Sequence, residues 1–399
     1  MTRPDPRVVA KLPLAPHSLP ERFVSITSAF GLTIAATFSL GLALPPQTVA
    51  QLPSDSGAQV ERVADGIFAI VHRDATRDWP SRATDWPHGN TGVIVGEDGI
   101  LVVDATFYPG RARADIALIR RLSDRPVRYL VNTHWHGDHT HGNAVYRAAF
   151  PGIHIVSQRA NRDFIAVNQE RLRSLATRPG FGYRAALADL EATLARGADS
   201  AGRPFTAAER DGLTEAVAER RVEVAELAAV QVSPPDLLFD DTLTILLGRR
   251  RAQLRNWGRA NSPQDVTVYV PGERTLFTGD ILVHPVPYTM YSYPTLWIAV
   301  LDGVERLSPV ALVPGHGPVF RDLGYLRDVR ALFVSATTQA EAMMRQGLSW
   351  SEAQSRFQLD SMRARFVRDN DPTAVAFWDY SVLDALLERS WACVQGMRC

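Results

Sequence analysis

The sequence feature that most constrains this chain is an apolar run that ends in a cluster of histidines and an aspartate. Residues 127 to 131 are rich in β-branched and aromatic side chains and predict a strand. Directly after the run come four potential metal ligands, His134, His136, Asp138 and His139. Sites in α/β folds lie at the carboxyl ends of strands, so we expect a site at this point.

The spacing of the cluster predicts how its side chains converge. His134 and His136 are two residues apart, and extended backbone directs such a pair to one side. Gly137 permits a tight turn, after which Asp138 and His139 return on the other side. Imidazole and carboxylate are ligands of zinc and related metals, so two converging sets predict two adjacent ions. Four of the ten histidines fall within eight residues, which argues against scattered surface histidines.

Two later segments add ligand candidates. Asp280 stands in a Thr-Gly-Asp turn and His316 in a Pro-Gly-His-Gly turn, each after a strand-like run. The pattern His-x-His-x-Asp-His, followed by these two turns, resembles the motifs of the metallo-β-lactamase-fold hydrolases over roughly residues 60 to 320. This resemblance implies an α/β (α+β) fold class, a four-layer αββα sandwich, here with a helical insertion and C-terminal helices.

The resemblance also implies a ligand set for two metals. His134 and His136 would bind the first metal, and Asp280 would bridge the two. The ligands of the second metal would be Asp138, His139 and His316. A buried Asp104, before a Tyr-Pro-Gly turn, would orient a loop or a ligand histidine.

Asn261 stands where the family places a third histidine of the first site. An amide oxygen is a harder and weaker donor than imidazole, so we expect the first site to bind zinc less tightly or to prefer Mn or Fe. His284 or His141 could supply a nitrogen instead. The remaining candidates His72, His88 and His154 are expected to be structural or surface residues.

The implied chemistry is hydrolysis by metal-activated water of an ester, thioester, lactone or amide. Asp138 or Asp280 would take up the proton of that water. The family's β-lactam-cleaving members carry Cys or Ser at the bridging position, so Asp280 disfavours a dedicated β-lactamase. The chain contains no Gly-x-Ser-x-Gly element that would supply a serine nucleophile.

Three other functions remain open at this point. The weakened first site allows a single-iron thiol dioxygenase of the same fold, and a non-catalytic metal-binding member would also fit the motifs. A nuclease is disfavoured, because 43 basic and 43 acidic residues leave no net charge to attract nucleic acid. We therefore expect a small-molecule substrate.

The chain divides into three predicted regions. Residues 1 to 50 contain basic residues and then no charge from Phe23 until Asp55, as in an export signal or an uncleaved membrane anchor, so a periplasmic or secreted location is predicted. Residues 51 to 335 form the main domain, with a helical insertion at about 158 to 232, and residues 336 to 399 form a C-terminal helical extension.

Several finer features remain open. The insertion is predicted to contain about three helices and could be a lid, a packing layer or the arm of a homodimer. Cys393 and Cys399 could form a disulfide or remain free. The aromatic residues from 288 to 293, with Trp297, could line the substrate or pack against the sheet. Alternating apolar residues from 60 to 71 predict one strand.

Overall fold

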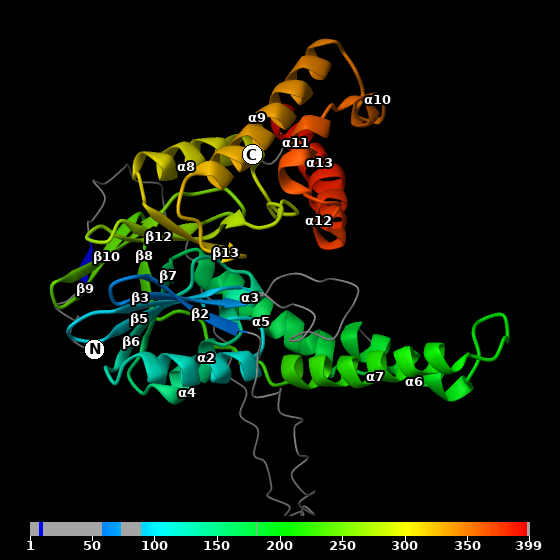
Figure 1. The fold of residues 1–399 in the computed structure, drawn as a ribbon, viewed down its shortest axis with the longest axis horizontal. Coiled ribbons are helices and arrows are strands. Elements are labelled where there is room, and N and C mark those ends of the chain that lie inside the picture. Colours follow the sequence, from blue (N-terminus) through cyan, green and yellow to red (C-terminus); the bar gives the residue numbers. More distant parts are fainter. Residues whose placement is uncertain (1–7, 11–57, 73–88, 181, 397–399) are drawn as a thin grey trace, which may run out of the picture.

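Two β-sheets face each other, and helices cover both outer sides (Figure 1). The structure is a computed structural model and describes residues 8–10, 58–72, 89–180 and 182–396. The arrangement is the predicted four-layer αββα sandwich. Most of the predicted export signal, His88 and Cys399 lie outside the described residues.

The strands follow the chain closely within each sheet. The first sheet contains, in spatial order, β2 (Ala58–Ala64), β3 (Ile67–His72), β4 (Thr91–Val95), β5 (Ile100–Val103), β6 (Val127–Val131), β7 (His154–Gln158) and β8 (Leu237–Phe239). The second contains β1 (Val8–Ala10), β9 (Thr242–Leu247), β10 (Arg250–Asn256), β11 (Val266–Val270), β12 (Thr275–Val283) and β13 (Ala311–His316). The pairs β5–β6, β6–β7 and β12–β13 are parallel. The carboxyl end of β6 therefore lies at the same edge of the first sheet as those of β5 and β7, and the carboxyl end of β13 lies at the same edge of the second sheet as that of β12.

The helices fall into three groups (Figure 1). Near the first sheet lie α2 (Pro109–Leu122), α3 (Gly137–Thr140) and α4 (Asn143–Ala149). Between β7 and β8 the chain forms α5 (Asn161–Thr177), α6 (Gly182–Arg196) and α7 (Ala207–Ala228). Over the second sheet and beyond it lie α8 (Pro294–Arg306), α9 (Gly324–Arg345), α10 (Trp350–Ala353), η1 (Gln354–Arg356), α11 (Asp360–Phe366), α12 (Pro372–Phe377), the π-helix η2 (Trp378–Leu386) and α13 (Leu387–Val394).

Alternation along each strand builds a core on both faces of the first sheet. In β6, Tyr129 and Val131 point into the core between the sheets, whereas Leu130 points toward α2 and α4. On the outer face of the second sheet, Trp297 of α8 packs against Phe333 of α9 with ring centroids 4.7 Å apart. Trp297 is fully buried there, so it belongs to the core and not to a substrate wall.

One segment of the first sheet differs from the sequence prediction. The alternating stretch from 60 to 71 is a hairpin of β2 and β3 and not one strand, because Gly66 turns the chain with φ of 63°.

The three helices predicted for the insertion are present, and Figure 1 shows α6 and α7 projecting from the sandwich as an antiparallel pair. The predicted boundary at residue 335 falls inside α9. Among the helices of the described ranges, none combines the length and the apolar composition needed to cross a bilayer.

Candidate metal centre

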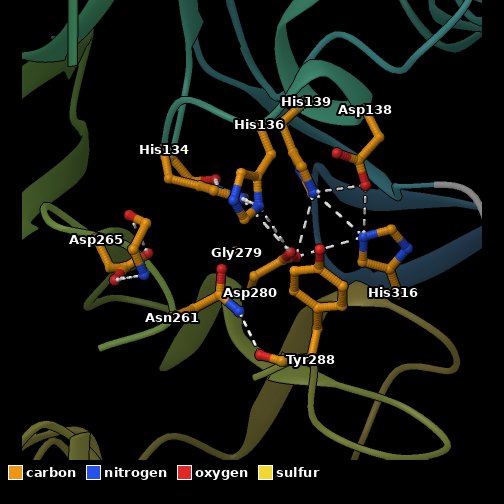
Figure 2. Close-up of polar contacts among 12 residues, drawn as sticks. His134, His136, Asp138, His139, Asn261, Asp265, Gly279, Asp280, Tyr288 and His316 are labelled. Carbon is orange, nitrogen blue, oxygen red and sulfur yellow. Dashed lines mark hydrogen bonds and ion pairs between the residues drawn. The ribbon is translucent and has the colours of Figure 1, made fainter. Parts of the chain in front are cut away.

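The histidine cluster begins after the end of β6 and ends inside α3. Gly137 begins α3, and a Cβ added there would lie 2.4 Å from Nε2 of His141. A side chain at this position would therefore displace the His141 ring, which belongs to the C-cap residue of the same helix. The short helix turns Asp138 and His139 back toward the two preceding histidines, as the spacing predicted (Figure 2).

Asp280 reaches the same point from the other sheet. It lies inside β12 and not after the strand as predicted, at a register shift on either side of Gly279. Gly279 has φ of 51°, and a Cβ there would lie 2.6 Å from the Thr133 hydroxyl. The irregularity brings the carboxylate between the two halves of the cluster.

Four donor atoms form the first possible metal site, which we call the four-donor group. They are Oδ2 of Asp138, Nε2 of His139, Oδ1 of Asp280 and Nε2 of His316. Five separations among them measure 3.0, 3.2, 3.2, 3.4 and 3.5 Å. Ligands about 2.0–2.2 Å from a tetrahedral zinc ion lie roughly 3.3–3.6 Å from one another. The group therefore has the size of a zinc site.

Three donor atoms form a second set, the three-donor group. Nε2 of His134 lies 2.9 Å from Nδ1 of His136, and these nitrogens lie 3.4 and 3.9 Å from Oδ2 of Asp280. Asp280 thus offers one oxygen to each group (Figure 2). This is the bridging position that the sequence motifs implied.

The charges of these groups favour cation binding. Burial opposes protonation of His139, but the carboxylates of Asp280, Asp138 and Asp104 outweigh it and hold its pKa well above the usual value. Burial would raise the pKa of Asp280, yet the nearby His139, His316 and His134 hold it well below the ordinary range. The same carboxylates, Asp280 and Asp138, raise the pKa of His316. The protons held by His139 and His316 together carry the charge of one divalent ion, so a metal ion can replace them.

His134 is uncharged near neutral pH, as a metal ligand must be. Burial, together with the charge of His139, lowers the pKa of His134 to about 4. The ring is neutral near pH 7, and its lone pair is available to a metal.

Asp104 orients the cluster from behind. Its Oδ2 accepts a hydrogen bond from Nδ1 of His139 at 2.9 Å, and its two oxygens accept from the backbone N–H and hydroxyl of Thr133 at 2.8 and 2.9 Å. The bond to His139 turns the other ring nitrogen toward the four-donor group. The predicted orienting position of Asp104 agrees with these contacts.

Asn261 lies beside the three-donor group, on the loop between β10 and β11. Its side chain is fully buried, and its Nδ2 donates to the carbonyl of Tyr288 at 2.7 Å. Its Oδ1 has no hydrogen-bond partner within the described residues, and Figure 2 shows this oxygen on the side facing Asp280. A buried acceptor without a partner suits a weak fourth ligand.

The two alternative histidines do not reach either group. His141 places Nδ1 3.1 Å from the carbonyl of Phe107 and Nε2 3.2 Å from Oδ1 of Asn168. His284 packs against the rings of Phe320 and Tyr325 at 5.9 and 5.3 Å. The interpretation of either residue as a replacement ligand was therefore wrong.

Aromatic side chains border the three-donor group. The Trp135 ring lies 6.1 Å from that of Phe164 on α5 and 5.8 Å from that of Tyr291. Both Tyr288 and Tyr291 lie 5.8 Å from the His136 ring. We call Trp135, Phe164, Tyr288 and Tyr291 the aromatic rim.

Sequence reasoning missed two buried supports of the site. Asn90 donates to the carbonyls of Pro314 and Gly317 at 3.0 and 2.8 Å and so holds the turn of His316. Asp265 accepts hydrogen bonds from the N–H groups of Ala260 and Ser262 and so closes the Asn261 loop. Only the second had a local signal, because Ser262 and Asp265 stand three residues apart in a turn.

Comparison with known proteins agrees with this architecture. Residues 84–316 match the family model of the metallo-beta-lactamase superfamily. A linear primary-alkylsulfatase from Pseudomonas sp. (strain ATCC 19151) is 24% identical over 237 residues, which cover 56% of this chain and 40% of that protein. The chain thus spans less than half the length of this curated relative.

Solved structures align with the chain at low sequence identity. The stereoselective inverting sec-alkylsulfatase from Pseudomonas sp. aligns with a TM-score of 0.56 and 15% identity, over 84% of this chain and 50% of that one. A metallo-beta-lactamase from Pontibacter korlensis aligns with a TM-score of 0.48 and 15% identity, over 69% of this chain and 99% of that one. The family match covers more than half of the chain and includes the histidine cluster, Asp280 and His316, so the chain belongs to the metallo-beta-lactamase superfamily.

Proposed function

We propose that the chain hydrolyses an ester bond in an amphiphilic substrate, with two metal ions held by the four-donor and three-donor groups. The observation that carries the proposal is that Asp280 offers one oxygen to each group. Zinc suits the four-donor group by ligand type and size, whereas Mn or Fe remains an option at the three-donor group beside Asn261. Such ions, when bound, acidify water and polarise the bond under attack.

The two aspartates have different roles in this proposal. Asp138 has a side chain that is 32% exposed, whereas that of Asp280 is 3% exposed. Asp138 can therefore accept a proton from water and pass it to the leaving group or to solvent. The pKa values of both carboxyl groups lie well below the ordinary range, so both are ionised at rest. Asp280 differs in being buried, and it holds the two groups together with one oxygen in each.

The aromatic rim supports a substrate with an apolar part. Phe164 and Tyr291 are each 46% exposed, so an alkyl or aryl group can cover them. Alkyl sulfate esters are the first candidates, because the curated relative and the sec-alkylsulfatase act on them by name. The carbonyl esters, thioesters, lactones and amides expected from the sequence form the second class.

A substrate panel with metal analysis tests the proposal. We expect purified protein to carry up to two transition-metal ions and to hydrolyse at least one alkyl sulfate or carbonyl ester. His139→Ala should abolish turnover, and His154→Ala, which changes a half-exposed histidine paired with Asp236, should retain it. Loaded protein that hydrolyses no substrate would support the non-catalytic reading, and oxygen uptake with a persulfide and one iron would support the dioxygenase.

We also propose that residues 1 to 50 direct export. The protein should then appear in the periplasm or medium without this segment, and an intact chain in the cytoplasm would contradict export. A homodimer through α6 and α7 remains a separate prediction, which sedimentation of the purified protein tests.

A further inference from the structure

We propose that Ser381, on the C-terminal π-helix η2, is a positioning residue for Asn261 at the metal centre. This inference rests on the proposed metal centre. It assigns to the C-terminal helices a part in shaping the three-donor group, through the loop that carries Tyr288.

Ser381 binds the chain on both sides of Tyr288. The side chain is fully buried, and its Oγ accepts a hydrogen bond from the N–H of Thr289 at 3.0 Å. The same hydroxyl donates to the carbonyl of Pro287, and the Thr289 hydroxyl donates to the Ser381 carbonyl. One helical residue therefore holds the two neighbours of Tyr288, and it lies in the wider turn of a π-helix, a form often found at functional sites.

Tyr288 transmits this restraint to Asn261. The carbonyl of Tyr288 accepts the Nδ2–H of Asn261 at 2.7 Å. A carbonyl can only accept, so the amide nitrogen must face it and Oδ1 must face the opposite way. Figure 2 shows that the opposite way is the side of Asp280, which belongs to the three-donor group.

Two further contacts join the loop that carries Tyr288 to the Asn261 turn on one side and to the C-terminal helices on the other. The N–H of Tyr293 donates to the carbonyl of Ala260 at 2.9 Å. Nε of Arg389 on α13 donates to the carbonyl of Ser292 at 2.8 Å. These contacts hold the far end of the loop, whereas Ser381 holds the residues on both sides of Tyr288. The side chain of Tyr288 itself is hydrogen-bonded to that of Tyr380, which precedes Ser381 on η2.

Loss of the Ser381 hydroxyl should move the loop at Tyr288. The N–H of Thr289 and the carbonyl of Pro287 would be left buried without their partner, and the backbone would shift to satisfy them. Asn261 would then lose its fixed orientation, while the candidate ligands that follow β6 and those on α3, β12 and β13 would stay in place.

Ser381→Ala and Ser390→Ala form a matched pair for the test. Ser390 is also fully buried in the C-terminal helices, but its hydroxyl has no hydrogen-bond partner within the described residues. We expect Ser381→Ala to weaken the more loosely bound metal ion about tenfold, as removal of an outer support does, and to change the Co(II) absorption spectrum. Ser390→Ala should leave both unchanged.

A double-mutant cycle with Asn261→Ala identifies the route of the effect. Ser381→Ala should have little further effect on metal affinity once Asn261 is gone, because it acts through that side chain. Fully additive losses would overturn the inference, as would a Ser381→Ala protein that matches Ser390→Ala in affinity and spectrum.

Two controls keep the outcome decisive. If Ser381→Ala does not fold, Thr289→Val removes one bond of the same contact and should weaken metal binding in the same direction, and no effect would overturn the inference. If the wild-type protein hydrolyses substrate and Ser381→Ala leaves metal affinity and the Co(II) spectrum unchanged, only this inference is rejected. Wild-type protein that binds no metal and hydrolyses nothing rejects the proposed function itself.

Discussion

The Oδ2 atom of Asp104 lies 2.9 Å from Nδ1 of His139, and this contact decides which nitrogen of the ring faces the four-donor group. Asp104 has φ of 64°, a conformation that asparagine tolerates better than most residues. Asp104→Asn should therefore fold but orient His139 poorly. We expect metal affinity at the four-donor group to fall by roughly 10- to 100-fold, measured by competition with a chelator. Exposed Asp98→Asn serves as the control, and equal affinity in the two variants would contradict the orienting role of Asp104.

Asn261→His tests the composition of the three-donor group. Imidazole is a better ligand than an amide oxygen for zinc, so the variant should bind the weaker ion at least about tenfold more tightly, equivalent to ~1.4 kcal/mol. Metal content after dialysis against a weak chelator measures the change. An unchanged metal content in a folded variant would show that Asn261 lies outside the site.

Gly137→Ala tests the close contact between the Gly137 backbone and the His141 side chain. The added Cβ would lie 2.4 Å from Nε2 of His141 and 3.1 Å from Oδ1 of Asn168. Both must move, so we expect a loss of about 1–3 kcal/mol in the free energy of unfolding and weaker metal binding, measured by denaturant unfolding and metal titration.

The matched control for this substitution is Gly212→Ala in α7. No atom lies within 4 Å of the added Cβ at Gly212, and alanine favours a helix. Gly212→Ala should raise the free energy of unfolding by about 0.5–1 kcal/mol. Equal effects of the two substitutions would mean that Gly137 is not required for space.

Local patterns predicted the parts of the site that lie within one segment. The strand before the cluster has the predicted bounds, since residues 127 to 131 form β6. Asp65 and Gly66, which connect β2 and β3, are typical turn residues and indicated a hairpin. A turn of two residues does not interrupt an alternation of period two, however, so the apolar pattern fits one strand and a hairpin equally well.

Contacts between distant segments could not be predicted in the same way. The bond between Asn261 and the Tyr288 carbonyl depends on how two loops from different strands meet, and no residue pattern encodes that meeting. Similarly, Trp297 and Tyr291 stand six residues apart in one aromatic stretch, yet one is in the core and the other is half exposed. Family resemblance therefore indicated the residues that meet in the two donor groups and Asp104 behind them, but not the supports Asn90 and Asp265.

Glu223 on α7 makes stability depend on pH. Burial raises its pKa to about 7, although Arg220 opposes this shift through charge and a hydrogen bond. Between pH ~4.5 and ~7 the folded protein keeps a proton that the unfolded chain loses, so stability falls as pH rises through this window, by roughly 3 kcal/mol in total. Glu223→Gln should remove this decline and be more stable than wild type at pH 8.

Asp211 provides the control for this measurement. It lies exposed on the same helix, so Asp211→Asn should keep the wild-type decline. Urea unfolding at pH 5, 6, 7 and 8 gives the profile of each protein. A parallel profile for Glu223→Gln and wild type would mean that Glu223 is ionised in the folded protein throughout.

Phe164 tests whether the aromatic rim contacts the apolar part of the substrate. Its ring stands on α5, 46% exposed and 6.1 Å from the Trp135 ring, so a substrate chain leaving the metal centre toward Tyr291 would cover its free face. Covering about half of a phenylalanine side chain contributes about 1 kcal/mol. Phe164→Ala should therefore raise KM about fivefold for a long-chain alkyl ester, with kcat little changed because the metal ligands are untouched.

The length of the substrate chain separates this role from a general disturbance of α5. A short-chain ester should not reach Phe164, so its KM should stay at the wild-type value. Val167→Ala, on the same helix and 67% exposed, should change neither KM, because Val167 does not belong to the rim. If Phe164→Ala raised KM equally for both chain lengths, the helix and not the contact would be responsible, and the rim would have no part in substrate selection.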